Sequence, residues 1–377
     1  MEVNNLPEPT LITTPDALHR LADLLIRQEI IAVDTESNSL YVYQEQVCLI
    51  QFSTRKQDFL VDPLALDDLS PLAPVFASPK ITKVFHAAEY DLIVMKRDYN
   101  FTFSNLFDTM LAGRILGWEA VGLGNILQIH FGIHADKRFQ RADWGKRPLT
   151  AEMMAYARLD THFLIPLRSL QIEQLKTSGR MPIAEEDFRR ACHVTATNQK
   201  KSVYESFWRV SGSRILTPQK AAVLRELCLY RNEIAQKINR PLFKVINNKT
   251  LYNIAEACPK TLDELANIKG MSRYLVKQHG RALLKAIQAG LRQDPIYPPR
   301  NKRPSDAYLN RLENLRHWRK EKAQSMKVGS DVILPRDLLF AIAEAAPHNP
   351  EELAEILYEV PWRLEHFGDE ILSVVQG

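Results

Sequence analysis

The first half of the chain alternates between two kinds of hydrophobic pattern. Segments in which apolar residues run continuously or alternate with polar ones are typical of β-strands, and they occur at 30–36, 47–54, 58–62 and 81–86. Helical spacing of apolar residues predicts helices over 15–28 with Thr14 as N-cap, near 67–77, over 87–99, 107–117 and 121–130, and one long helix over 150–176. Because the strands come early and are joined by short connections, we expect an antiparallel start to the sheet and a mixed α/β domain.

The second half, from about residue 183, is predicted to be helical and to contain an internal repeat. Moving the segment 224–284 forward by 88 positions places IAEACP (254–259) on IAEAAP (342–347) without a gap. Such self-similarity indicates two copies of one small helical domain. A Pro-rich, basic segment at 294–306, typical of a linker, separates them. The predicted domains are 1–205, 213–291 and 304–377.

The composition is that of a globular protein without a membrane segment. Of the 377 residues 45% are hydrophobic and 25% charged, and no apolar run approaches the ~20 residues needed to cross a bilayer. The N-terminus lacks the basic and apolar regions of a signal peptide. Four cysteines without a CxxC pair are typical of free thiols in a reducing cytosol, so we expect a cytoplasmic protein. The net charge of +4 permits a polyanionic partner without requiring one.

Acidic side chains interrupt the predicted apolar surfaces. In IIAVDTES, Asp34 and Glu36 lie on one face of a strand, because strand side chains alternate between faces. Asp91 and Asp160 each fall on the apolar stripe of a predicted helix, and Asp160 lies one turn from Tyr156. Taken singly, each acid is also explained by a solvated strand end or by a basic partner elsewhere in the chain.

Together, the four acids predict a metal site. Carboxylates that enter one pocket from apolar surfaces carry a large desolvation cost if they stay unpaired. Mg²⁺ and Mn²⁺ prefer carboxylate oxygens and offset that cost, and two such ions suit in-line displacement at a phosphodiester. We therefore expect two divalent metal ions held by Asp34, Glu36, Asp91 and Asp160, with the Tyr156 hydroxyl as a candidate to hold the attacking water.

Three segments resemble the motifs of a known exonuclease superfamily. The DxE strand (Asp34, Glu36), the HAAEYD segment (Asp91) and the YARLD segment (Tyr156, Asp160) resemble the motifs of the DEDD superfamily, in the subgroup whose third motif is YxxxD. The segments LIQFS, FDTMLAGRILG and DWGKRPLT support this resemblance. The two repeats resemble HRDC domains, and nearly the whole chain resembles the ribonuclease D family.

The resemblance implies a fold, an activity and roles for the motif residues. The fold is a ribonuclease H-like α/β exonuclease domain, with a mixed sheet flanked by helices, followed by two all-α HRDC-like domains. The activity is metal-dependent 3′→5′ exoribonuclease action that releases 5′-mononucleotides from RNA, including tRNA precursors with 3′ extensions. Carried over by position, the four acids bind the metal ions and Tyr156 orients the water. Since no self-pairing helix is apparent, we expect a monomer.

One residue departs from the family pattern, and two other functions remain compatible with the residues. Ser37 stands where bacterial members often have an aromatic residue, so this stretch is closer to the eukaryotic exosome-associated relatives and contacts to the terminal nucleotide stay open. A DNA 3′→5′ exonuclease would share the acidic motifs, and no residue identified here reads a 2′-hydroxyl. A catalytically silent RNA-binding scaffold is disfavoured because all four acids and Tyr156 are present.

Residues near the motifs have two interpretations each. His86, at the end of a predicted strand, contacts substrate or makes a structural hydrogen bond. Lys137 and Arg147, together with Arg141, bind phosphates or form surface salt bridges. Asp108, in FDTML, is expected to cap a helix rather than to bind metal.

The two helical copies differ in charge. Lysines of the first copy correspond to other residue types in the second: Lys244, Lys249, Lys260, Lys269 and Lys277 against Val332, Asp337, His348, Leu357 and Glu365. Basic residues of this kind form either a solvated surface or a nucleic-acid interface. If one copy contacts RNA we expect the first, whereas the second packs on the nuclease domain.

Overall fold

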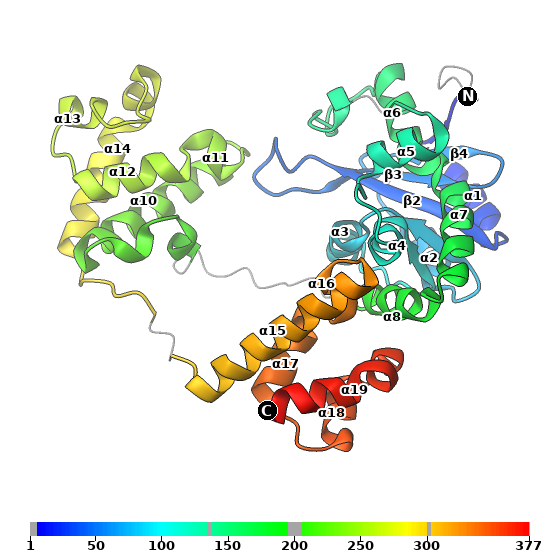
Figure 1. Cartoon of the computed structure of the whole chain (residues 1–377). Helices are drawn as coiled ribbons and strands as arrows, with labels where there is room; N and C mark the ends of the chain where they lie inside the picture. Colours follow the sequence, from blue (N-terminus) through cyan, green and yellow to red (C-terminus); the bar gives the residue numbers. More distant parts are fainter. Residues whose placement is uncertain (1–5, 135–136, 195–205, 300–302, 377) are drawn as a thin grey trace. The chain divides into compact units, whose positions relative to one another are not determined.

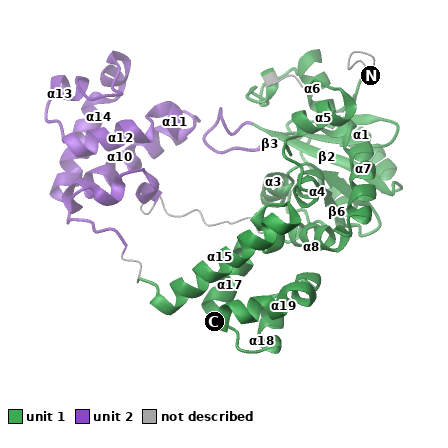
Figure 2. Ribbon diagram, in the orientation of Figure 1, with its two compact units in different colours: residues 1–37, 47–196, 303–377 green, residues 38–46, 197–302 purple. Residues whose placement is uncertain are grey.

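The computed structural model describes residues 6–134, 137–194, 206–299 and 303–376 (Figure 1). The chain forms two compact units (Figure 2). The first contains residues 1–37, 47–196 and 303–377, and the second contains residues 38–46 and 197–302. Each unit is described separately below. None of the helices in the described ranges has both the length and the apolar character needed to cross a bilayer.

A six-stranded mixed sheet forms the centre of the first unit. Its strands are β1 (Thr10–Ile12), β2 (Ile30–Ser37), β3 (Val47–Ser53), β4 (Asp58–Val61), β5 (Thr82–Phe85) and β6 (Leu106–Asp108), in the order β1-β4-β3-β2-β5-β6. β2 and β4 pair antiparallel with β3, whereas the β2–β5, β5–β6 and β1–β4 pairs are parallel. The expected antiparallel start and mixed sheet are confirmed. The edge strands β1 and β6 have three residues each, too few for alternation to be recognised in the sequence.

Helices cover both faces of this sheet. They are α1 (Pro15–Leu25), α2 (Ala73–Ala77), α3 (Glu89–Tyr99), α4 (Thr109–Leu116), α5 (Leu123–Phe131), α6 (Ala151–His162), α7 (Leu164–Thr177) and α8 (Met181–Cys192), with short 3-10 turns at Ser70–Leu72 and Lys137–Phe139. Successive β2 residues enter different cores, because strand side chains alternate: Ile31 belongs to the core that contains Leu18 of α1, and Ala32 to the core that contains Ile183 of α8. Thr14 caps α1 as expected, since its side chain accepts a hydrogen bond from the Ala17 N–H.

The prediction of a single helix over 150–176 is wrong. α6 ends at His162 and α7 begins at Leu164, and Phe163 between them has φ −95° and ψ −1°. Proline lacks the N–H that would bond to the carbonyl four residues earlier, and its ring clashes with that carbonyl, so Pro166 prevents a continuous helix across His162. The break lets α6 pack against β2, β3 and β4, where it carries Tyr156 and Asp160.

The second helical copy belongs to the first unit. Its helices are α15 (Asp306–Met326), α16 (Ser330–Ile333), α17 (Arg336–Ala345), α18 (Pro350–Ile356) and α19 (Pro361–Gln376). Val332 of α16 joins the apolar core that contains Ile183 of α8, and Arg363 of α19 is fully buried against Glu186 of α8 at 2.8 Å. The second copy therefore packs on the nuclease domain, the arrangement expected if the first copy contacts RNA.

The first helical copy forms most of the second unit. Its helices are α10 (Pro218–Lys237), α11 (Leu242–Val245), α12 (Asn248–Ala257), α13 (Leu262–Ala266) and α14 (Arg273–Arg292), preceded by 3-10 turns at Phe207–Arg209 and Ser213–Ile215. The copies share backbone detail: Cys258 after α12 and its counterpart Ala346 after α17 are both left-handed, with φ 49° and 51°. Within this unit the Tyr43 hydroxyl donates to Asn232 Oδ1 at 2.7 Å, and its N–H donates to Asn239 Oδ1 at 3.1 Å. The boundaries 1–205, 213–291 and 304–377 stay a prediction.

Candidate active site

One cavity of about 240 Å³ brings together residues from five parts of the first unit. It is lined by Asp34, Thr35 and Glu36 of β2, His86 after β5, Leu123 of α5, Gln140, and Tyr156 and Asp160 of α6. Three of the predicted metal-binding acids, the predicted water-holding tyrosine and His86 thus share one space. α6 reaches it because Thr150 caps the helix, accepting a hydrogen bond from the Met153 N–H at 3.2 Å, so that the apolar side of α6 lies on the sheet.

Asp91, the fourth acid, lies on α3 and is held against β2. Its carboxylate accepts a short hydrogen bond from the hydroxyl of Thr35, the residue between Asp34 and Glu36. Asp91 is absent from the residues that line the cavity, yet its charge raises the pKa values of both Asp34 and Glu36. All four acids therefore interact electrostatically although they come from three elements.

Asp108 has a structural role at the ends of β5 and β6. It is the N-cap of α4, and its carboxylate accepts hydrogen bonds from the N–H groups of Met110 and Leu111 at 2.8 and 3.1 Å. The same carboxylate accepts from the N–H groups of Ala87 and Ala88 at 3.1 and 2.8 Å, just before α3. The expected cap is confirmed, and it also fixes the approach of the helix that carries Asp91.

Burial raises the pKa of every acid in this group, and repulsion from other members of the group adds to the rise for Asp34, Glu36 and Asp160. Burial is the largest cause in each case. It raises the pKa of Asp34 well above its usual value, with added repulsion from Asp91, Asp160 and Glu36. The pKa of Glu36 rises to about 9, with repulsion from Asp160 and Asp91. The pKa values of Asp91 and Asp160 rise to about 7. In Asp91 the hydrogen bond from Thr35 opposes this rise. A cation is the missing counter-charge.

The four carboxylates suit hard divalent ions as ligands, although no three of them are grouped tightly enough to hold one ion. Four carboxylates supply only oxygen ligands, which Mg²⁺ and Mn²⁺ prefer. In the part of the chain that the structure describes, no three Asp, Glu, His or Cys side chains are grouped tightly enough to hold one ion. In chemistry and charge the residues fit the predicted metal ions.

Aromatic contacts hold Tyr156 at the wall of the cavity. Its ring centroid lies 5.8 Å from that of Phe139 and 6.0 Å from that of Trp144. Trp144 is 1% exposed and packs in a small core with Met153 and Ala157 of α6. The tyrosine is thus fixed on one side by packing, and its other side lines the space that contains Asp160.

His86 makes the structural hydrogen bond that was one of its two interpretations. Its Nδ1 lies 2.8 Å from the Thr109 hydroxyl, and that hydroxyl donates to the Phe85 carbonyl at 3.0 Å. Since the hydroxyl proton is already engaged, Nδ1 of His86 is the donor and Nε2 carries the lone pair. Burial lowers the pKa of His86, so the ring is a neutral imidazole. It also lines the cavity, and its contact with substrate stays a prediction.

Arg147, predicted to bind phosphates, is not among the residues that line this cavity. Arg147 donates to both carboxylate oxygens of buried Asp62 at 2.6 Å and to the carbonyls of Cys48, Trp144 and Lys146 at 2.7 to 2.8 Å. All five of its N–H groups are engaged, so the structure favours the salt-bridge interpretation and gives the phosphate contact no support. The side chain of Lys137 lies outside the described part of the chain.

Several residues of the site were not predicted. Thr35, Leu123 and Gln140 line the cavity. Gln51 of β3 is paired in register with Asp34, so both point to the same face of the sheet; it is fully buried, and its amide has no hydrogen bond to any described residue. A signal existed for Gln51, a polar residue inside the apolar run VCLIQFS. Leu123 and Gln140 gave none, because they come from elements whose spatial position the sequence does not reveal.

Comparison with known proteins identifies related sequences and folds. Residues 9–173 match the family described as 3′-5′ exonuclease, and residues 220–287 and 309–375 match the HRDC domain. The chain is 30% identical to ribonuclease D of Gluconacetobacter diazotrophicus, over 98% of this chain and 94% of that protein. The crystal structure of Escherichia coli RNase D superimposes with a TM-score of 0.71 at 25% identity, covering 98% of this chain and 99% of that one. The catalytic core of RRP6 from Trypanosoma brucei gives a TM-score of 0.65 at 28% identity, covering 77% of this chain and 81% of that one.

Proposed function

Since the chain belongs to the ribonuclease D family and is a 3′→5′ exoribonuclease, we propose that its four clustered acids and Tyr156 form the active site that shortens RNA from its 3′ end. The observation that carries the assignment is the cluster itself. The half-buried acids of β2 and α6 line a cavity of about 240 Å³, the buried Asp91 of α3 lies against β2, and each of the four has a raised pKa. Perturbed carboxylates that converge on one cavity are typical of catalytic sites.

Asp34, Glu36, Asp91 and Asp160 are the proposed metal ligands. Exonucleases of this type depend on divalent metal ions. Two bound ions would supply an activated water and neutralise the charge that develops on the leaving oxygen. Thr35, by donating to Asp91, orients that carboxylate toward β2. Asp108 fixes the start of α3 through the N–H groups of Ala87 and Ala88.

Tyr156 is proposed to position the attacking water through its hydroxyl. Its ring is immobilised between Phe139 and Trp144, so the hydroxyl is held at a fixed place in the cavity wall. A positioned nucleophile avoids an entropic cost at the transition state. His86 also lines the cavity, and we assign its Nε2 an accepting contact with a hydroxyl of the terminal nucleotide.

The proposed products are 5′-mononucleotides, and the proposed substrates are RNAs with 3′ extensions, tRNA precursors among them. We propose that the protein acts as a monomer in the cytoplasm. Support for a reducing compartment comes from the cysteines: Cys48, Cys192, Cys228 and Cys258 are all free thiols in the described structure.

The first helical copy is proposed to contact the RNA. Its residues Phe243 and Tyr274 are 53% and 67% exposed, beside the basic residues of that copy. Their counterparts in the second copy, Asp331 and Trp362, are engaged with the nuclease domain through Arg114 and Glu186. Exposed aromatic rings with basic neighbours suit single-stranded RNA. We expect Tyr274→Ala to weaken RNA affinity about tenfold, as stacking is worth about 1–3 kcal/mol per base. Tyr358→Ala, at an exposed position of the second copy, is the matched control, and equal losses in both variants would exclude a specific role for the first copy.

A gel time-course tests the activity. The substrate is a 5′-labelled tRNA transcript with a 3′ extension, incubated with Mg²⁺, Mn²⁺ or EDTA, beside a DNA of matched sequence. We expect shortening from the 3′ end in the presence of metal, no reaction in EDTA, and slower decay of the DNA. Faster decay of the DNA would contradict the RNA assignment, and full activity in EDTA would contradict the metal site.

A further inference from the structure

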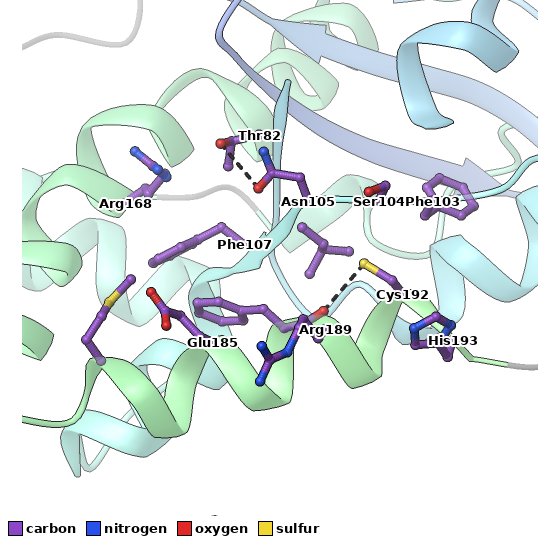
Figure 3. Close-up of a pocket in the computed structure, with 13 residues that line it drawn as sticks. Thr82, Phe103, Ser104, Asn105, Phe107, Arg168, Glu185, Arg189, Cys192 and His193 are labelled. Carbon is purple, nitrogen blue, oxygen red and sulfur yellow. Dashed lines mark hydrogen bonds between the residues drawn. The ribbon is translucent and has the colours of Figure 1, made fainter. Parts of the chain in front are cut away.

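A second and larger cavity lies at the other end of the parallel strands. It has a volume of about 460 Å³ and is bounded by the residues at the start of β5 and β6, by α7 and by α8 (Figure 3). The active site lies at the opposite end of these two strands, where His86 follows β5 and Asp108 is the last residue of β6. None of the residues that line this cavity lines the active-site cavity. Its volume is in the range of small-molecule sites.

The wall of this cavity is basic. Figure 3 shows Arg168 entering from α7, and Glu185, Arg189 and His193 at α8. Glu185 is the only acidic side chain among the described residues that line it. Arg168 is half-buried, and the described residues give it neither an ion pair nor a hydrogen bond; its Nε is fully buried without a partner. Its guanidinium carbon lies 5.4 Å from the centroid of the Phe107 ring.

Two further cations lie behind the wall. Lys83 is fully buried, and its ammonium donates to the Ser78 carbonyl at 2.6 Å. The Lys96 ammonium donates to the carbonyls of Cys192 and Val194, both at 2.7 Å. Neither lysine has a carboxylate partner in the described ranges. Both lie near the Cys192 thiol of the cavity wall, since their charges oppose the rise that burial causes in its pKa. Lys83 is buried and Lys96 half-buried without an anion, so this region has an excess of positive charge, which is costly where it is buried.

We propose that this cavity binds a phosphate group, either free or in a small phosphomonoester, with the guanidinium of Arg168 as its principal anchor. The planar donor pair of an arginine matches phosphate oxygens, and a bound dianion would supply the counter-charge that the wall lacks. Ser104 and Thr82 add hydroxyl groups. The rings of Phe103, Phe107 and Phe188 form an apolar part of the wall, and the last two lie 4.5 Å apart. That part suits the planar base of a nucleotide, so nucleoside monophosphates and free phosphate are the two sources to be distinguished.

Calorimetric titration of the full-length protein in EDTA tests this site. The probes are inorganic phosphate, AMP and adenosine. In EDTA the acidic active site repels anions, and the Asp160→Asn variant, titrated in parallel, accounts for any binding there. We expect one site that binds the phosphate group of either probe, and no comparable binding of adenosine. Tighter binding of AMP than of phosphate identifies a nucleotide, and equal binding identifies phosphate; either supports the site.

Substitutions separate a binding role from a structural one. We expect Arg168→Gln to weaken binding at least about tenfold, Arg168→Lys to restore part of the affinity, and Arg20→Gln, at an exposed arginine of α1, to leave it unchanged. Circular dichroism checks that each variant is folded. If Arg168→Gln does not fold, Arg189→Gln on the exposed side of the cavity replaces it, with a smaller expected loss. The proposal would be refuted if the wild type bound neither phosphate nor AMP, or if the folded arginine variants bound them with undiminished affinity.

Discussion

The first unit contains two groups of buried acids, and they differ in what faces them. In the active site, Asp34 and Asp160 face other carboxylates, and repulsion adds to burial in raising their pKa values. Between α8 and α19, Glu186 and Asp187 face Arg363, which donates to them at 2.8 and 3.0 Å. Burial raises the pKa values of this second pair too, but the charge and hydrogen bonds of Arg363 oppose the rise.

The difference separates a group of acids kept for chemistry from one kept for assembly. Arg363 is fully buried and also donates to the Val332 and Ile333 carbonyls, so each nitrogen of its guanidinium has a partner in the protein. In the proposed active site the acids repel one another instead, and the proposed metal ions would offset that repulsion. Removing a charge is therefore expected to have opposite effects on stability in the two places.

The largest expected effect is the loss of activity in Asp160→Asn. Removing one carboxylate weakens the cation site, and we expect the rate on 3′-extended RNA to fall by at least about 10³-fold. The metal-free variant is expected to unfold at a higher temperature than the wild type at pH 8, because one repelling charge is gone. Activity and thermal unfolding in EDTA are the measurements, with Asp67→Asn at an exposed site as control. A lower unfolding temperature in Asp160→Asn would mean that the acid is structural.

Arg363→Leu is expected to have the opposite effect on stability. The variant leaves Glu186 and Asp187 buried without their cation, and breaking a buried pair from one side costs about 3–5 kcal/mol. The first helical copy has Leu275 at the corresponding position, so leucine is compatible with the helical fold itself. Denaturant unfolding measures the loss, with Arg303→Leu, which breaks an exposed pair with Asp306, as control. Equal effects of the two substitutions would show that the buried pair adds nothing.

The sequence predicted the active site better than the interface that supports it. The alternation in IIAVDTES, which marked Asp34 and Glu36, and the helical spacing of Asp160 were local signals. All three residues line one cavity. The Arg363 junction joins α19 to α8 across more than 170 residues, and no local pattern marks Arg363 as buried. The repeat offered an indirect signal, since arginine replaces a leucine there. Pro166 was visible, but its effect on the predicted long helix was overlooked.

Tyr156→Phe tests whether the tyrosine acts with the acids or only packs. The ring contacts with Phe139 and Trp144 survive the substitution, so we expect unchanged stability. Loss of the hydroxyl is expected to lower the rate about 10²-fold, by misplacing the nucleophile, with little change in RNA affinity. Single-turnover kinetics and thermal unfolding provide the two readouts, and Tyr358→Phe is a control at an exposed tyrosine. An unchanged rate would assign Tyr156 to packing alone.

The smallest expected effect is a pH dependence of stability in the metal-free protein. The pKa of Asp160 lies near 3.8 when unfolded and at about 7 when folded, so between these pH values the folded state holds a proton that the unfolded chain has released. Stability contributed by this group therefore falls as pH rises from about 4 to about 7 and is constant above. The difference between wild type and Asp160→Asn cancels groups that do not interact with Asp160, such as Lys83 with its pKa lowered to about 8, and reports Asp160 together with the acids that it repels.

Thermal unfolding in EDTA from pH 5 to pH 8 is the measurement. The advantage of Asp160→Asn over the wild type should grow by several degrees across this range and then level off. Added Mg²⁺ should stabilise the wild type more at pH 8 than at pH 5, because metal binding requires deprotonated carboxylates. Arg363→Leu leaves Asp160 and its titration unchanged, so this variant should respond to Mg²⁺ as the wild type does. A constant difference between Asp160→Asn and wild type at every pH would show that Asp160 is already ionised in the folded protein, and the contrast between the two groups of acids would then have another cause.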